Sequence, residues 1–193
     1  MKDWKKELLT IPNLLSMFRL VLIPVYVAIY QGATTSDGYF LAAAILAVSC
    51  LTDLIDGKIA RHFNMVSAVG KILDPLADKA TQFTLIVCLA AKHRIIRYMV
   101  ALFLVKETFQ TVAGLLTIHK GRMLRGALIT GKICTTVLFI SLIIMVLLPN
   151  LSEQFITAIT LIDIGFLLLS FSDYVATYLF CAKRFEPFDN PLN

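Results

Sequence analysis

Four aspartates lie close together in an otherwise apolar chain, at Asp53, Asp56, Asp74 and Asp78. The first two are three residues apart and the last two are four apart, so each pair shares one face of a helix. If these two helices form an antiparallel hairpin, the four carboxylates surround one point. An all-oxygen donor set without His or Cys favours Mg²⁺ or Mn²⁺. Four carboxylates suffice for two such ions, the arrangement that clamps the attacking and leaving oxygens of a phosphoryl transfer.

The alternative interpretation of this stretch is a set of solvated aspartates at helix ends. Asp74 precedes Pro75, as an N-cap precedes a proline in the first helical position. Small residues nevertheless favour a binding site. Gly57 and Ala60 lie near the face of the first aspartate pair, and Gly70 lies one turn before Asp74. Asp74 can therefore both cap a helix and bind a metal.

The composition predicts a membrane protein. The 193 residues are 58% hydrophobic and only 16% charged, with a mean hydropathy of +0.79, whereas soluble chains carry about 25% charged residues. We expect an all-α polytopic protein with one membrane domain over residues 1–193. It comprises an amphipathic surface helix at 1–10, a bundle over 12–180 and a polar tail at 181–193. The six expected transmembrane helices are 12–31, 39–61, 71–91, 95–118, 126–148 and 153–180.

The distribution of basic residues predicts the orientation in the membrane. An even number of spans puts both termini on one side. Of the 18 lysines and arginines, only three (Lys92, Arg94 and Arg97) fall on the side opposite the termini, and the others fall on the side of the termini. The positive-inside rule therefore places the termini and the aspartate stretch in the cytoplasm. The net charge of +5 suits membrane lipid headgroups, and no alternation of basic and aromatic residues indicates nucleic acid as a partner.

The aspartate stretch carries a recognisable pattern, DxxDGxxAR followed by eight residues and GxxxDxxxD, from Asp53 to Asp78. It resembles the signature of the CDP-alcohol phosphotransferase family, with every fixed position filled. The resemblance implies a bacterial membrane enzyme in which a hydroxyl attacks the β-phosphate of CDP-diacylglycerol and CMP leaves.

The resemblance also implies roles for individual residues. Asp53, Asp56 and Asp74 would hold two divalent cations, and Asp78 would contact one of them and accept the hydroxyl proton, acting mainly by position. The residues expected to border the cytidine diphosphate are Asp53, Asp56, Gly57, Ala60, Arg61, Ser67 and Gly70.

Three further segments resemble the phosphatidylglycerophosphate synthases of this family: IPNLLSMFR at 11–19, GKILDPLADK at 70–79 and TGKICT at 130–135. This implies sn-glycerol 3-phosphate as the acceptor, whose phosphate needs basic side chains. The candidates are Lys106, Arg122, Arg125, Lys132 and Arg19.

Several of these residues have a second interpretation. Arg122 and Arg125 also fit ordinary loop charge on the cytoplasmic side. Arg19 shares a face with Asn13 and Ser16 at a spacing of three. Arg19 lies too deep in its expected span to reach the membrane surface, so we expect it to pair with an acid. Its role is then either structural or contact with a headgroup phosphate.

The acceptor also has an alternative. The chain reads Lys106-Glu107 where these synthases often carry Arg-Glu, and lysine and arginine grip a phosphate differently. Cardiolipin synthases of the same family share the IPN segment, the first-helix arginine and LDPLADK, and would use phosphatidylglycerol.

Two non-enzymatic functions compete with the transferase. Carboxylates within a membrane also mark ion pathways, so a divalent-cation transporter is one alternative. The absence of an internal repeat or a pair of broken helices disfavours it. A non-catalytic scaffold is the other, and the complete aspartate set disfavours that. A homodimer is an expected assembly.

Overall fold

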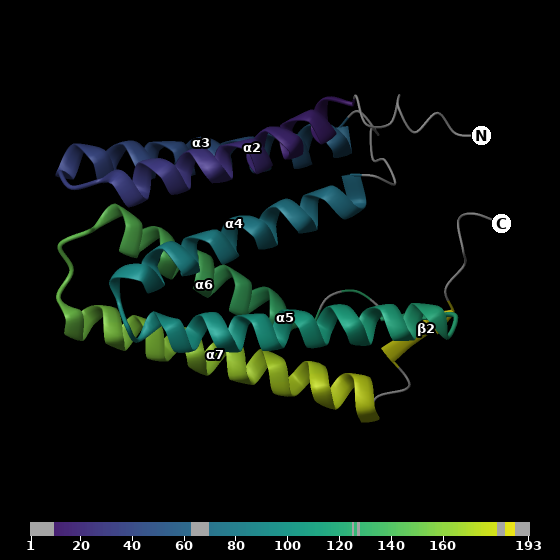
Figure 1. Ribbon diagram of the computed structural model, residues 1–193. Helices are drawn as coiled ribbons and strands as arrows, with labels where there is room; N and C mark the ends of the chain where they lie inside the picture. Colours follow the sequence, from purple (N-terminus) through teal and green to yellow (C-terminus); the bar gives the residue numbers. More distant parts are fainter. Residues whose placement is uncertain (1–9, 63–69, 125, 127, 181–183, 188–193) are drawn as a thin grey trace. The chain divides into compact units, whose positions relative to one another are not determined.

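The computed structural model describes residues 10–62, 70–124, 126, 128–180 and 184–187 (Figure 1). The described helices are α2 (Ile11–Gly32), α3 (Ser36–His62), α4 (Gly70–Lys92), α5 (Ile96–His119), α6 (Ile129–Leu147) and α7 (Glu153–Phe180). Two short strands, β1 (Arg122–Leu124) and β2 (Phe185–Pro187), complete the order of elements. The surface helix expected at 1–10 falls outside the described residues except for Thr10.

The chain divides into two compact units. Unit 1 contains Met1–Lys92 and Leu142–Asn150, and unit 2 contains His93–Ser141 and Leu151–Asn193.

Each of the six expected spans corresponds to one helix, so the predominantly helical architecture is confirmed. Within the described part of the chain, four helical segments are long and apolar enough to cross a membrane: Asn13–Gly32, Ile96–His119, Ile129–Leu147 and Glu153–Phe180. Within the described residues, Ser36–Thr52 of α3 forms a shorter apolar helical segment. Six crossings stay a prediction.

In unit 1, α2 packs against both α3 and α4, and its buried face is polar. Asn13, Ser16 and Arg19 are at most 2% exposed, whereas Met17 and Phe18 are each 44% exposed. This pattern suits a helix that presents apolar side chains to lipid and polar side chains to its neighbours. The shared face expected from the spacing of three is confirmed.

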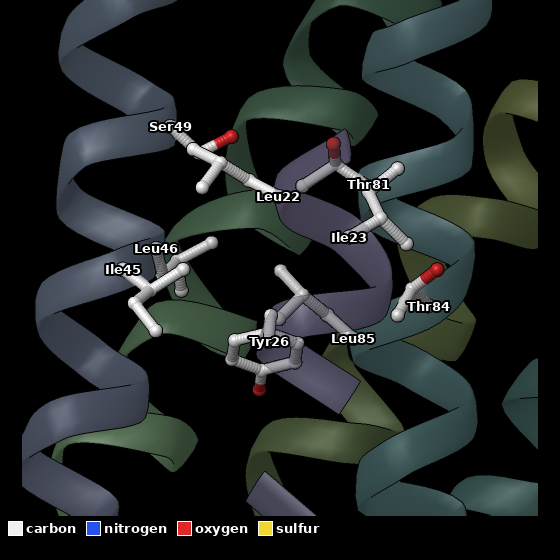
Figure 2. Close-up of a pocket in the computed structure, with 9 residues that line it drawn as sticks. All are labelled: Leu22, Ile23, Tyr26, Ile45, Leu46, Ser49, Thr81, Thr84 and Leu85. Atoms are coloured by element: carbon white, nitrogen blue, oxygen red, sulfur yellow. The ribbon is translucent and has the colours of Figure 1, made fainter. Parts of the chain in front are cut away.

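A small cavity lies between these three helices (Figure 2). Its volume of about 10 Å³ has room for roughly one water molecule. The lining residues are Leu22, Ile23 and Tyr26 of α2, Ile45, Leu46 and Ser49 of α3, and Thr81, Thr84 and Leu85 of α4. The interior of unit 1 is therefore too closely packed here to admit a substrate.

In unit 2, α5 packs against α7, and hydrogen bonds join α6 to α7. Ser141 Oγ donates to Asp163 Oδ1 at 3.0 Å, and Thr130 Oγ1 donates to Asp173 Oδ2 at 2.6 Å.

Strands β1 and β2 form an antiparallel pair, which departs from the purely helical fold expected from the sequence. Neither three-residue segment shows the alternation typical of a strand, and the two are far apart in the chain. The pairing therefore depends on tertiary structure.

Candidate active site

Two motif aspartates lie near the start of α4, and α2 supplies a hydrogen-bond donor to each. Ser16 Oγ donates to Asp74 Oδ1 at 2.5 Å, and Arg19 Nη1 donates to Asp78 Oδ1 at 2.6 Å. The donors are three residues apart and the acceptors four, so each pair occupies one face of its helix. The first turns of α2 thus set the orientation of both carboxylates.

The ion pair between Arg19 and Asp78 is buried on one side and open on the other. The Arg19 side chain is 3% exposed and that of Asp78 is 50% exposed. Arg19 Nη2 also lies 3.5 Å from Ser16 Oγ. The hydrogen bond from Arg19 to Asp78 joins two charged groups, so it is stronger than a hydrogen bond between neutral groups. Arg19 therefore holds Asp78 from inside the unit while half of the carboxylate surface stays accessible.

This contact confirms the expectation that Arg19 pairs with an acid. The bond from Ser16 to Asp74 was not predicted. The spacing of Asn13, Ser16 and Arg19 was the available signal, but it identifies a polar face without identifying the helix that meets it.

The remaining motif residues are described only in part. Asp53 and Asp56 lie in the last turns of α3, and Gly70 begins α4. The structure does not describe Ser67 or the side chains of Asp53, Asp56, Ala60 and Arg61. Gly57 is described only as part of α3. Within the described part of the chain, no three His, Cys, Asp or Glu residues come together. The four-carboxylate metal site and the nucleotide contacts stay predictions.

The described half of the predicted metal site fits a divalent cation. Asp74 and Asp78 supply carboxylate oxygens one helical turn apart, the donor type that Mg²⁺ and Mn²⁺ prefer. Carboxylates that bind metals are commonly oriented by hydrogen bonds from surrounding residues. Ser16 and Arg19 supply such bonds here.

In unit 2, the predicted acceptor residues differ in burial. Lys106 is 3% exposed, its Nζ donates to Glu107 Oε1 at 2.6 Å, and the same atom lies 5.9 Å from the centre of the Tyr174 ring. Arg122 of β1 and Lys132 of α6 are exposed. Arg125 lies outside the described residues. Lys106 thus provides a cation in the interior of unit 2.

Comparison with known proteins assigns the chain to a class. The family model for CDP-alcohol phosphatidyltransferase matches residues 9–171. The chain belongs to this family and is a CDP-diacylglycerol-dependent phosphatidyltransferase.

Its relatives include enzymes with different acceptors. A probable phosphatidylglycerophosphate synthase from Mycobacterium tuberculosis is 30% identical over 179 residues, which are 91% of this chain and 84% of that protein. The CDP-diacylglycerol–glycerol-3-phosphate 3-phosphatidyltransferase of Escherichia coli K12 is 44% identical over 69 residues, 36% of this chain and 37% of that protein. A CMP-forming cardiolipin synthase from Streptomyces coelicolor is 35% identical over 118 residues, 58% of this chain and 54% of that protein.

Proposed function

We propose that the protein transfers the phosphatidyl group of CDP-diacylglycerol to sn-glycerol 3-phosphate and releases CMP. The observation that carries the choice of acceptor is the buried Lys106 of unit 2. A buried cation is costly unless an anion compensates it, and Glu107 supplies one negative charge beside it. A phosphate monoester is a strong second partner for this lysine. The long alignment with the mycobacterial protein named a phosphatidylglycerophosphate synthase supports the same acceptor.

The proposed reaction is an in-line displacement at the β-phosphate. The acceptor hydroxyl oxygen forms a new bond to that phosphorus as its proton passes to the Asp78 carboxylate. The bond between the β-phosphorus and the bridging oxygen breaks, and CMP leaves with the electron pair. Arg19 Nη1 fixes Oδ1 of Asp78, so the carboxylate is positioned before substrate arrives.

The negative charge of the diphosphate requires positive charge beyond that of the side chains described above. When bound, two divalent cations, Mg²⁺ or Mn²⁺, held by Asp53, Asp56, Asp74 and Asp78, would neutralise the diphosphate and the leaving CMP. Ser16 contributes by keeping Asp74 in one orientation.

We place this site and both termini on the cytoplasmic side. Basic residues predominate on that side of the predicted topology. Glycerol 3-phosphate and CMP are water-soluble, and the half-exposed Asp78 is suited to chemistry at a membrane surface.

Phosphatidylglycerol is the second candidate acceptor. The similarity to the cardiolipin synthase of Streptomyces coelicolor favours it. Both acceptors present a primary hydroxyl near a phosphate, but the phosphodiester of phosphatidylglycerol carries a single negative charge, whereas the phosphate monoester of glycerol 3-phosphate carries up to about two. The buried Lys106 therefore favours glycerol 3-phosphate.

The deciding experiment measures CMP release by the purified, reconstituted protein with CDP-diacylglycerol and Mg²⁺. Glycerol 3-phosphate and phosphatidylglycerol are offered separately, and Asp78→Asn serves as the inactive control. We expect release with glycerol 3-phosphate. Release with phosphatidylglycerol alone would reassign the acceptor, and release with neither would contradict the proposed reaction.

A further inference from the structure

The C-terminal strand is paired with the connector between α5 and α6. Arg122 aligns with Pro187, Met123 with Glu186 and Leu124 with Phe185. Gly121 and Gly126, on either side of β1, have φ angles of 68° and 71°, which glycine adopts far more readily than other residues. The described part of the connector thus contains β1, flanked by two glycines with positive φ angles.

A two-stranded ribbon is marginally stable on its own, and aromatic contacts anchor this one. The Phe185 ring lies 5.6 Å from that of Tyr178, which lies 6.4 Å from Tyr174 and 6.2 Å from Phe109. We call Phe185, Tyr178 and Tyr174 the aromatic column. These spacings are typical of favourable ring pairs, so the column ties the tail to α7 and α5.

The same column reaches the start of α6. Tyr174 packs against Gly131 of α6, since a Cβ added at Gly131 would lie 2.8 Å from the Tyr174 hydroxyl. Thr130 donates to Asp173, the neighbour of Tyr174. α7 therefore holds the far end of the connector, while β2 holds its strand.

The segments held in this way carry two exposed cations of unit 2. Arg122 lies in β1, and Lys132 follows directly after Gly131 in α6. The column ends at Tyr174, whose ring lies 5.9 Å from Lys106 Nζ. One continuous set of contacts thus runs from the C-terminal strand to the connector, the start of α6 and the buried lysine.

We propose that β2 and the aromatic column position the basic connector so that its cations meet the phosphate of the acceptor. The inference rests on the proposed function and adds the C-terminal strand as a positioning element. Phe185 acts through Arg122 and Lys132 and takes no part in the chemical step. Loss of the anchor should weaken acceptor binding without affecting CDP-diacylglycerol.

The test compares Phe185→Ala and a chain that ends at Arg184 with a matched control, Phe180→Ala. Phe180 is 81% exposed at the end of α7, so its loss should change nothing. We expect Phe185→Ala to raise the KM for glycerol 3-phosphate roughly three- to tenfold, the change that one lost aromatic contact corresponds to. The KM for CDP-diacylglycerol should stay constant.

Amide hydrogen exchange of residues 122–124 without substrate gives a second readout. It should accelerate in both altered proteins and stay unchanged in the control. The proposal would be overturned if the KM for glycerol 3-phosphate stayed unchanged in both Phe185→Ala and the shortened chain. Equal rises in the KM values for glycerol 3-phosphate and CDP-diacylglycerol would also overturn it.

Failure of the proposed function would look different from failure of this inference. The unaltered protein would then release CMP with phosphatidylglycerol only, or with neither acceptor. If CMP is released with phosphatidylglycerol only, the same KM comparison is made with phosphatidylglycerol as the acceptor. If CMP is released with neither acceptor, the proposed reaction is wrong, and the positioning role of β2 is wrong as well.

Discussion

Among the described residues, each unit buries one basic side chain, and the two are neutralised in different ways. Arg19 of unit 1 pairs with Asp78, 59 residues further along the chain. Lys106 of unit 2 pairs with Glu107, the next residue of the same helix. The first pair joins two helices and fixes a carboxylate of the motif. The second joins none, because both partners belong to α5.

The difference indicates that the two ion pairs have different roles. A pair between helices orients a group that must already be in place when substrate binds. A pair within one helix compensates a buried charge and imposes no position on another element. We infer that unit 1 holds a preassembled catalytic carboxylate, while unit 2 holds a cation that a ligand can engage. Each prediction below tests this distinction between the two ion pairs.

The largest effect is expected for Asp78→Asn. The amide keeps the size of the side chain but cannot accept the hydroxyl proton, so kcat should fall at least about 100-fold, within the range of lost general-base catalysis. Single-turnover measurements with glycerol 3-phosphate test this. Asp37→Asn, at an exposed position in the first turn of α3, is the control. A near-normal kcat for Asp78→Asn would remove Asp78 as the base.

Arg19→Ala is expected to have the next largest effect. Loss of a residue that orients a metal-binding carboxylate costs about 10- to 100-fold in activity or metal affinity. We therefore expect a lower kcat and a higher Mg²⁺ requirement. Arg19→Lys keeps the charge but loses the planar fork, so it should recover only part of the activity.

A double-mutant cycle separates this role from a general loss of stability. If Arg19 acts through Asp78, Arg19→Ala should cost much less in the Asp78→Asn background than in the unaltered protein. Equal costs in both backgrounds would show that Arg19 does not act through this carboxylate.

The sequence predicted those parts of this contrast that depend on local spacing. The spacing of Asp74 and Asp78 predicted that they share one face of a helix, and the depth of Arg19 in its apolar segment predicted that it pairs with an acid. The partner of Ser16 could not be predicted, because a helical face does not specify the helix packed against it. The anchoring of Phe185 against Tyr178 was equally inaccessible, since it depends on a strand pair between distant segments.

Lys106→Ala tests the other side of the contrast. Removing a charged hydrogen-bond donor to a phosphate corresponds to a rise of roughly tenfold or more in the acceptor KM. The KM for CDP-diacylglycerol should not change. Lys106→Arg should bind the acceptor nearly as well, because arginine also pairs with phosphate. Equal rises in both KM values for Lys106→Ala would show that Lys106 is not an acceptor contact.

The smallest effect is expected at the end of unit 1 remote from the aspartates. Lys92 Nζ lies 4.3 Å and 4.1 Å from the ring centres of Tyr30 and Tyr39 and donates to the Tyr39 hydroxyl at 2.5 Å. These contacts join α2, α3 and α4. Lys92→Ala should therefore lower the free energy of unfolding by about 1 kcal/mol, the scale of exposed cation–π contacts, and leave both KM values unchanged.

Denaturation in mixed micelles measures this loss, and Lys92→Arg should restore most of it, because arginine also stacks on aromatic rings. Arg94→Ala, a nearby exposed position, is the control for a simple loss of charge. If Lys92→Ala changed kcat as much as Arg19→Ala does, cations at both ends of unit 1 would serve catalysis. The distinction between a cation that orients a reacting carboxylate and one that only holds helices together would then be wrong.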